Sequence, residues 1–114
     1  MLAKQYRLTS RLDFKKVSSL GQPFFSPLFR IKRAKNSSDQ SRLAVVTPAR
    51  LSKKAVVRNR IRRQVSEILR LGHKDIIPGY DVVVWPKASA LDRPYQELEK
   101  DLLFLLFKAR VLKK

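Results

Sequence analysis

Apolar residues recur at helical spacing in three parts of the chain, and start or stop signals flank them. The predicted helices span residues 11–20, 53–71 and 94–111. Ser10 stands three residues before Asp13, which is the spacing of a capping box, and Gly21 follows the first helix as a stop signal. Pro94 lies near the first turn of the third helix. The second helix has a core stripe within about 80° of arc, formed by Val57, Ile61, Val65 and Ile68.

Three other segments are typical of strands because they alternate or are rich in β-branched residues. They span residues 29–32, 42–47 and 80–85, and the polar run 35–41 separates the first two as a loop. Pro23 and Pro27 before the first segment indicate a sheet edge or a break in a strand. We interpret the strands 29–32 and 42–47 as an antiparallel pair.

The order helix, strands, helix, strand, helix predicts an α+β fold in which three helices cover a small sheet of three to four strands. The strand 42–47, the helix 53–71 and the strand 80–85 form the kind of unit that joins two parallel strands. The length of 114 residues fits one domain over 1–114. Most of the apolar run Leu102–Phe107 is expected to pack on the sheet, and a partner or dimer surface is the alternative for its surplus.

Composition bears on the compartment of the protein. The longest apolar run has six residues, whereas a membrane span needs about 20. The first 14 residues lack an apolar stretch of signal-peptide length, and the chain contains no cysteine for a disulfide framework. We therefore expect a cytoplasmic protein that is not attached to a membrane.

Positive charge dominates the sequence and is unevenly distributed. The chain has 26 Lys and Arg against 9 Asp and Glu, a formal net charge of +17. Residues 1–70 hold 18 basic and 3 acidic side chains, while residues 71–114 hold 8 and 6. Because only a polyanion would offset self-repulsion of this size, we expect a nucleic-acid partner that contacts the N-terminal two thirds of the chain.

The helix predicted over 53–71 presents a basic face opposite its core stripe. Between Lys53 and Arg70 the only acidic residue is Glu67, so the mixed signs of an ordinary solvated helix face are missing. Guanidinium groups bind phosphate oxygens in pairs and stack on bases, which suits a structured RNA better than a small anion. The candidate RNA-binding residues are Lys53, Lys54, Arg58, Asn59, Arg60, Arg62 and Arg63.

The run AVVRNRIRR at 55–63 resembles the signature helix of the bacterial ribonuclease P protein component, with its arginine-asparagine-arginine motif in an apolar and basic setting. Two further segments are similar to that family. Residues 8–21 look like its first helix, and residues 80–84 look like the strand after the signature helix. The resemblance covers nearly the whole chain.

This resemblance implies a fold, an activity and a set of partners. Family members bind a large catalytic RNA, and the complex removes the 5′ leader from precursor transfer RNA, with the RNA and magnesium performing the chemistry. The chain is thus expected to be a monomeric subunit of an endoribonuclease holoenzyme, to bind no cofactor alone and to be inactive alone. The family also implies a left-handed crossover between the parallel strands, against a general right-handed preference of about 98%.

Residue by residue, the family's RNA-facing motif falls on Arg58, Asn59, Arg60, Arg62 and Arg63. Phe14, with Arg11 beside it, matches the aromatic residue that lines the cleft for the 5′ leader, and a plain core phenylalanine is the alternative for Phe14. Arg50 and Lys87 are further cleft candidates. The sequence departs from the family at Ser18, where a second aromatic residue is frequent. It also reads RLSKK at 50–54, where two basic residues followed by a glycine are usual.

The remaining residues do not predict a catalytic or metal site in the protein itself. His73 is the only histidine, and the nine carboxylates are scattered along the sequence. A self-contained nuclease is therefore a weak alternative, and a structural RNA-binding protein of the ribosomal type, with no enzyme role, is the stronger one. We interpret Trp85, at the end of a strand, as a core residue, and stacking on a base is the alternative.

Overall fold

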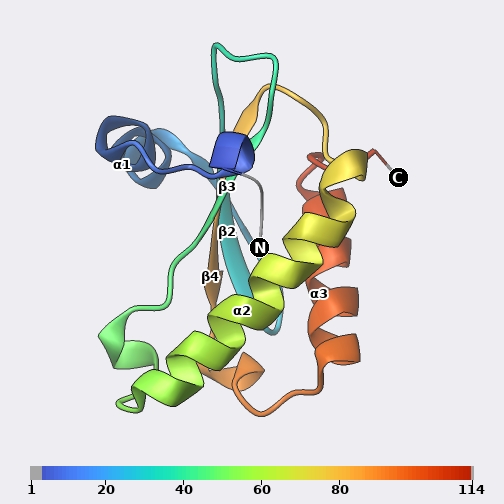
Figure 1. Ribbon diagram of the computed structural model, residues 1–114. Helices are drawn as coiled ribbons and strands as arrows, with labels where there is room; N and C mark the ends of the chain where they lie inside the picture. Colours follow the sequence, from blue (N-terminus) through green and yellow to red (C-terminus); the bar gives the residue numbers. More distant parts are fainter. Residues whose placement is uncertain (1–3, 114) are drawn as a thin grey trace.

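The computed structural model describes residues 4–113, in which helices cover both faces of a mixed sheet (Figure 1). The helices are α1 (Arg11–Leu20), α2 (Ala55–Gly72) and α3 (Tyr95–Lys108). The strands are β1 (Gln22–Phe25), β2 (Phe29–Lys35), β3 (Arg42–Val45) and β4 (Tyr80–Pro86). This arrangement confirms the predicted α+β class and the predicted order of elements. No helix among the described residues is long and apolar enough to cross a membrane.

The strand order is β1-β2-β4-β3, which corrects one predicted pairing. β2 and β3 are not neighbours, because β4 lies between them, antiparallel to β2 and parallel to β3. The antiparallel partner that β2 finds through a tight turn is β1, an edge strand that tolerates Pro23. The β3–α2–β4 unit with parallel strands is confirmed, and the hand of its crossover stays a prediction.

The main hydrophobic core lies between one sheet face and the helices α2 and α3. Ile61, Val65 and Ile68 of the predicted stripe are buried, while Val57 is half-buried at the first turn of α2. The apolar run in α3 is divided between two sides: Leu102, Leu105 and Leu106 are buried, and Phe104 and Phe107 are exposed. α3 ends at Lys108, three residues before the predicted end, and Arg110 then adopts the left-handed conformation.

Helix α1 covers part of the opposite sheet face. Its bounds are the predicted ones, and the Ser10 hydroxyl accepts a hydrogen bond from the backbone N–H of Asp13 at 3.4 Å. Val17 is buried against Val83, and Phe14 packs half-buried on the same small cluster. Figure 1 shows α1 beside the upper part of the sheet and the turn after β3 beside its lower part.

Candidate nucleic-acid interface

A row of aromatic and cationic side chains crosses the part of the sheet that α1 leaves open. The register places Phe25 of β1 opposite Arg30 of β2, and Arg30 opposite Trp85 of β4, so all three side chains share one face. The Arg30 guanidinium lies 4.4 Å from the centroid of the Trp85 ring, within cation–π distance. Phe25 is 56% exposed, and the Lys87 ammonium lies 5.7 Å from its ring centroid. We call these four residues the aromatic row.

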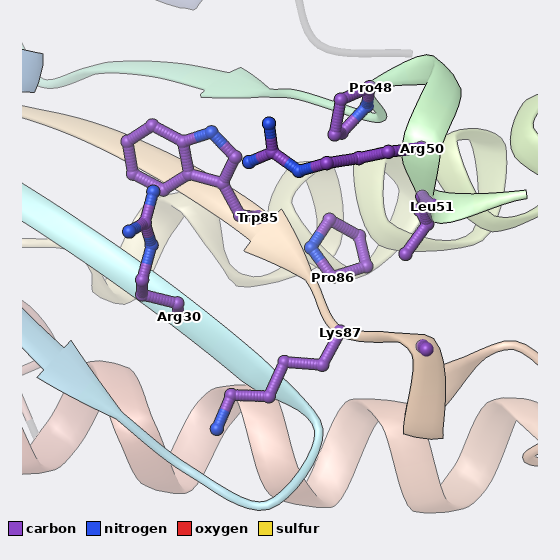
Figure 2. Close-up of a pocket in the computed structure, with 8 residues that line it drawn as sticks. Arg30, Pro48, Arg50, Leu51, Trp85, Pro86 and Lys87 are labelled. Atoms are coloured by element: carbon purple, nitrogen blue, oxygen red, sulfur yellow. The ribbon is translucent and has the colours of Figure 1, made fainter.

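A depression of about 330 Å³ adjoins the aromatic row (Figure 2). Figure 2 shows Arg50 extending from the turn after β3 toward the Trp85 indole, while Lys87 extends toward the turn between β1 and β2. The Lys87 ammonium donates a hydrogen bond to the Ser26 carbonyl at 2.6 Å, which fixes its direction. The lining has no acidic member and consists of Arg30, Pro48, Arg50, Leu51, Trp85, Pro86, Lys87 and Ala88. Its ring faces suit an unpaired base, and its cations suit phosphate groups.

The basic face of α2 forms a second charged surface, which we call the arginine ridge: Arg58, Asn59, Arg60, Arg62 and Arg63. Asn59 organises its centre, because its side-chain oxygen accepts a hydrogen bond from Arg62 at 2.6 Å and its carbonyl accepts one from Arg63 at 3.4 Å. Within residues 4–113 the arginines in ion pairs are Arg42, Arg70 and Arg93, so no ridge arginine is neutralised by a carboxylate. The ridge thus offers uncompensated charge on a rigid element.

The N-terminal end of α2 adds to this positive field. Lys53 and Lys54 are exposed just before the helix, and its first turn contains no acidic residue. The helix begins at Ala55, two residues after the predicted start, and Lys54 occupies the cap position without a side-chain cap bond. The unpaired backbone N–H groups of this end carry a partial positive charge that favours anions.

Hydrogen bonds place the arginine ridge next to the depression. Arg58 donates to the Ser52 carbonyl, in the turn that also carries Arg50 and Leu51. Arg60 donates to the Leu91 carbonyl at 2.7 Å, just beyond the short helical turn 88–90 after β4. The two surfaces are therefore held against each other by the segments that line the depression.

The structure brings some of the predicted cleft residues together and keeps others apart. Arg50 and Lys87 both line the depression. Phe14 packs on the small cluster that Trp85 also contacts, whereas Arg11 is exposed at the first residue of α1 and lines no part of the depression. Trp85 is half-buried and lines the depression in addition to packing on the cluster, so the core interpretation covers only part of its surroundings.

Sequence reasoning missed Arg30, and it named base stacking by Trp85 only as the alternative to a core position. The alternation Phe29-Arg30-Ile31-Lys32 already placed Arg30 opposite the core side of its strand. The pairing of Arg30 with Trp85 could not be predicted, because that contact depends on the register between β2 and β4.

Within residues 4–113 no three His, Asp or Glu side chains converge in a way that could hold a metal ion. The most buried carboxylate, Asp81, is 3% exposed and bonded to the Arg42 guanidinium. The side chains assembled here are suited to binding an anionic polymer.

Comparisons with known proteins give one consistent family. The family model for ribonuclease P matches residues 2–110. The ribonuclease P protein component of a Cyanothece species is 34% identical to this chain, with 98% of each chain covered. That of a Pseudanabaena species is 36% identical, with 98% of this chain and 97% of the relative covered.

Two solved structures are similar to the whole fold. A mutant of the Staphylococcus aureus ribonuclease P protein with defective mRNA degradation activity has a TM-score of 0.88 at 25% identity, with 96% of this chain and 92% of that chain covered. The ribonuclease P protein of Thermotoga maritima has a TM-score of 0.81 at 31% identity, with 90% and 96% covered. These findings support the ribonuclease P interpretation over the ribosomal one. The chain belongs to the ribonuclease P protein family.

Proposed function

We propose that this chain, as the protein subunit of ribonuclease P, holds the catalytic RNA on the arginine ridge and the 5′ leader of precursor transfer RNA along the aromatic row. The observation that carries the proposal is the contact between the two surfaces: Arg58 and Arg60 bond to the segments that line the depression. One molecule can therefore hold two RNA strands side by side. A single copy per catalytic RNA suffices for this role.

The two surfaces suit different kinds of RNA. The ridge presents guanidinium groups and no aromatic ring, so it recognises the phosphate positions of a folded RNA. The aromatic row combines ring faces with cations, which is the chemistry that binds single strands with little sequence preference. Phe14 of α1 packs against the same small apolar cluster as Trp85, and Ser18 one turn later adds no second ring. The leader is the single-stranded part of the precursor, so we assign it to the aromatic row.

The protein contributes positive charge and positioning, while magnesium belongs to the RNA complex. Phosphates of the catalytic RNA and of the precursor repel each other, and a subunit of net charge +17 between them lowers that repulsion. Magnesium ions held by the RNA serve the same electrostatic purpose. The benefit of the protein is thus expected to be largest where magnesium is scarce.

A magnesium titration of precursor cleavage tests the proposal with protein alone, catalytic RNA alone and both together. We expect no cleavage by the protein, and a stimulation of the RNA that is large at low magnesium and declines as magnesium rises. The mature transfer RNA, which lacks the leader, is expected to bind the holoenzyme more weakly than the precursor does. Cleavage by protein freed of RNA, or equal affinity for precursor and mature transfer RNA, would contradict the assigned roles.

A further inference from the structure

Arg42 joins two carboxylates that come from different parts of the fold. Its Nε and Nη2 atoms donate to the two oxygens of Asp81 at 2.9 and 2.8 Å, and its Nη1 donates to Asp13 of α1 at 2.9 Å. Asn36 donates to Asp81 at 2.8 Å and completes the partners of that buried carboxylate. Hydrogen bonding to Asp81 raises the pKa of Arg42. We call Asp13, Arg42 and Asp81 the clamp.

A second polar contact fixes the other end of α1. The Lys32 ammonium of β2 donates to the Ser18 carbonyl at 2.6 Å, near the C-terminal end of the helix. The clamp holds α1 to β3 and β4, and Lys32 holds it to β2, so the helix lies across the strands between two tethers. Phe14 is the residue next to Asp13 and lies between these tethers.

Hydrophobic packing alone gives α1 a small anchor. Val17 is its only buried residue, while Leu12 and Leu20 are 80% and 78% exposed. Deep burial of one valine is worth about 1.5–3 kcal/mol, which leaves the tilt and height of a ten-residue helix weakly determined. The polar tethers supply the missing restraint. Asp13 bonds to Nη1 of Arg42, whereas Asp81 bonds to Nε and Nη2, so replacing Asp13 leaves the bonds between Arg42 and Asp81 in place.

We propose that Asp13 and Arg42 are positioning residues for the 5′ leader, because they fix α1 and hold Phe14 at a set distance above the open sheet face. This inference rests on the proposed leader function. Neither residue needs to touch the RNA: Asp81 holds Arg42, Arg42 holds Asp13, and Asp13 sets the place of the helix that borders the cleft.

The test compares Asp13→Ala with Asp39→Ala in the reconstituted holoenzyme. Asp39 is an exposed carboxylate in the loop before β3 and forms no ion pair among the described residues, so both variants change the net charge equally. Removing negative charge near an anionic ligand favours binding if only electrostatics matter. If Asp13 positions α1, Asp13→Ala should instead weaken binding of the leader, and Asp39→Ala should not.

The measured quantity is the ratio of affinities for precursor and mature transfer RNA, which isolates the leader. We expect Asp13→Ala to lower this ratio by about 3- to 10-fold, the scale of one net hydrogen bond. Asp39→Ala is expected to leave the ratio unchanged or to raise it, and Asp13→Glu, which keeps the carboxylate, is expected to recover most of the loss. Affinity for the catalytic RNA and the melting temperature are followed in parallel.

The outcomes distinguish the positioning role of the clamp from the leader function of the protein. A ratio for Asp13→Ala that matches Asp39→Ala would overturn the positioning role, and so would an equal loss of affinity for the catalytic RNA. A large drop in melting temperature without recovery by Asp13→Glu would assign the clamp to fold stability alone. A wild-type holoenzyme that binds both transfer RNAs equally would instead refute the leader function itself.

Discussion

The arginine ridge can be tested by removing Arg62 and Arg63 together. Both side chains are exposed, and their contacts inside the protein are hydrogen bonds to Asn59. Arg58 is less suitable because it is half-buried and bonded to the Ser52 carbonyl, so its loss would also disturb the turn before α2. The double replacement with alanine should therefore remove phosphate contacts while the fold is retained.

The expected magnitude follows from counterion release. Each lost phosphate contact lowers the slope of log affinity against log salt by about 0.7–0.9, so two contacts lower it by about 1.4–1.8. Between 50 and 200 mM salt, which is about 0.6 log units, the affinity advantage of the unmodified protein should shrink by about 7- to 12-fold. Filter binding or fluorescence titration of the catalytic RNA at four salt concentrations measures this slope.

A matched control distinguishes local contacts from net charge. Replacing Lys100 and Lys108 of α3 with alanine removes the same two charges from exposed positions on another helix. That control should leave the slope close to the value of the unmodified protein. Equal slopes for the two double variants, with both shown to be folded by circular dichroism, would refute the ridge as the phosphate-binding surface.

Two further predictions concern individual side chains. Trp85→Ala should weaken binding of leader-bearing precursor by about 1–3 kcal/mol, the worth of one stacked base, while Trp85→Phe keeps most of the affinity; a similar loss with mature transfer RNA would contradict stacking on the leader. Arg70 lowers the pKa of Glu67, chiefly through the hydrogen bond at their ion pair, so Arg70→Ala should return this pKa toward 4.5 in a carboxyl titration followed by NMR. The folded-state pKa is the lower one, so the contribution of the pair to stability is present above about pH 4.5 and is lost as pH falls through the lowered value; identical Glu67 titrations in both proteins would contradict the coupling.

Elements that carry their own signals could be predicted from the sequence. α1 has a capping serine at Ser10 and a glycine at Gly21, and its bounds match the prediction at both ends. An added Cβ at Gly21 would lie 2.3 Å from the Val17 carbonyl, so the stop signal has a steric basis. The arginine ridge was equally visible, because one helix period places its members on one face.

Contacts between distant segments could not be predicted in the same way. The wrong pairing of β2 with β3 came from their closeness in sequence, whereas β4 enters between them from almost forty residues away. The aromatic row depends on the same register, since it unites residues of β1, β2 and β4. The clamp is a third case: Asp81 precedes a run of valines, and only the fold reveals that the half-buried Arg42 pairs with it.

The distribution of the carboxylates explains how a fold this basic can leave one surface free of negative charge. Five of them are engaged by the protein's own groups: Asp13 and Asp81 by Arg42, Glu67 by Arg70, Glu97 by Arg93, and Asp101 by Ser26 and the Leu28 N–H. None of these contacts involves the ridge arginines or the side chains that line the depression. The paired acidic groups thus bond to other parts of the protein, and among the described residues the ridge arginines and the cations that line the depression have no carboxylate partner. This separation of charges is what the proposed role requires, in which the subunit supplies affinity and orientation and the RNA partner performs the chemistry.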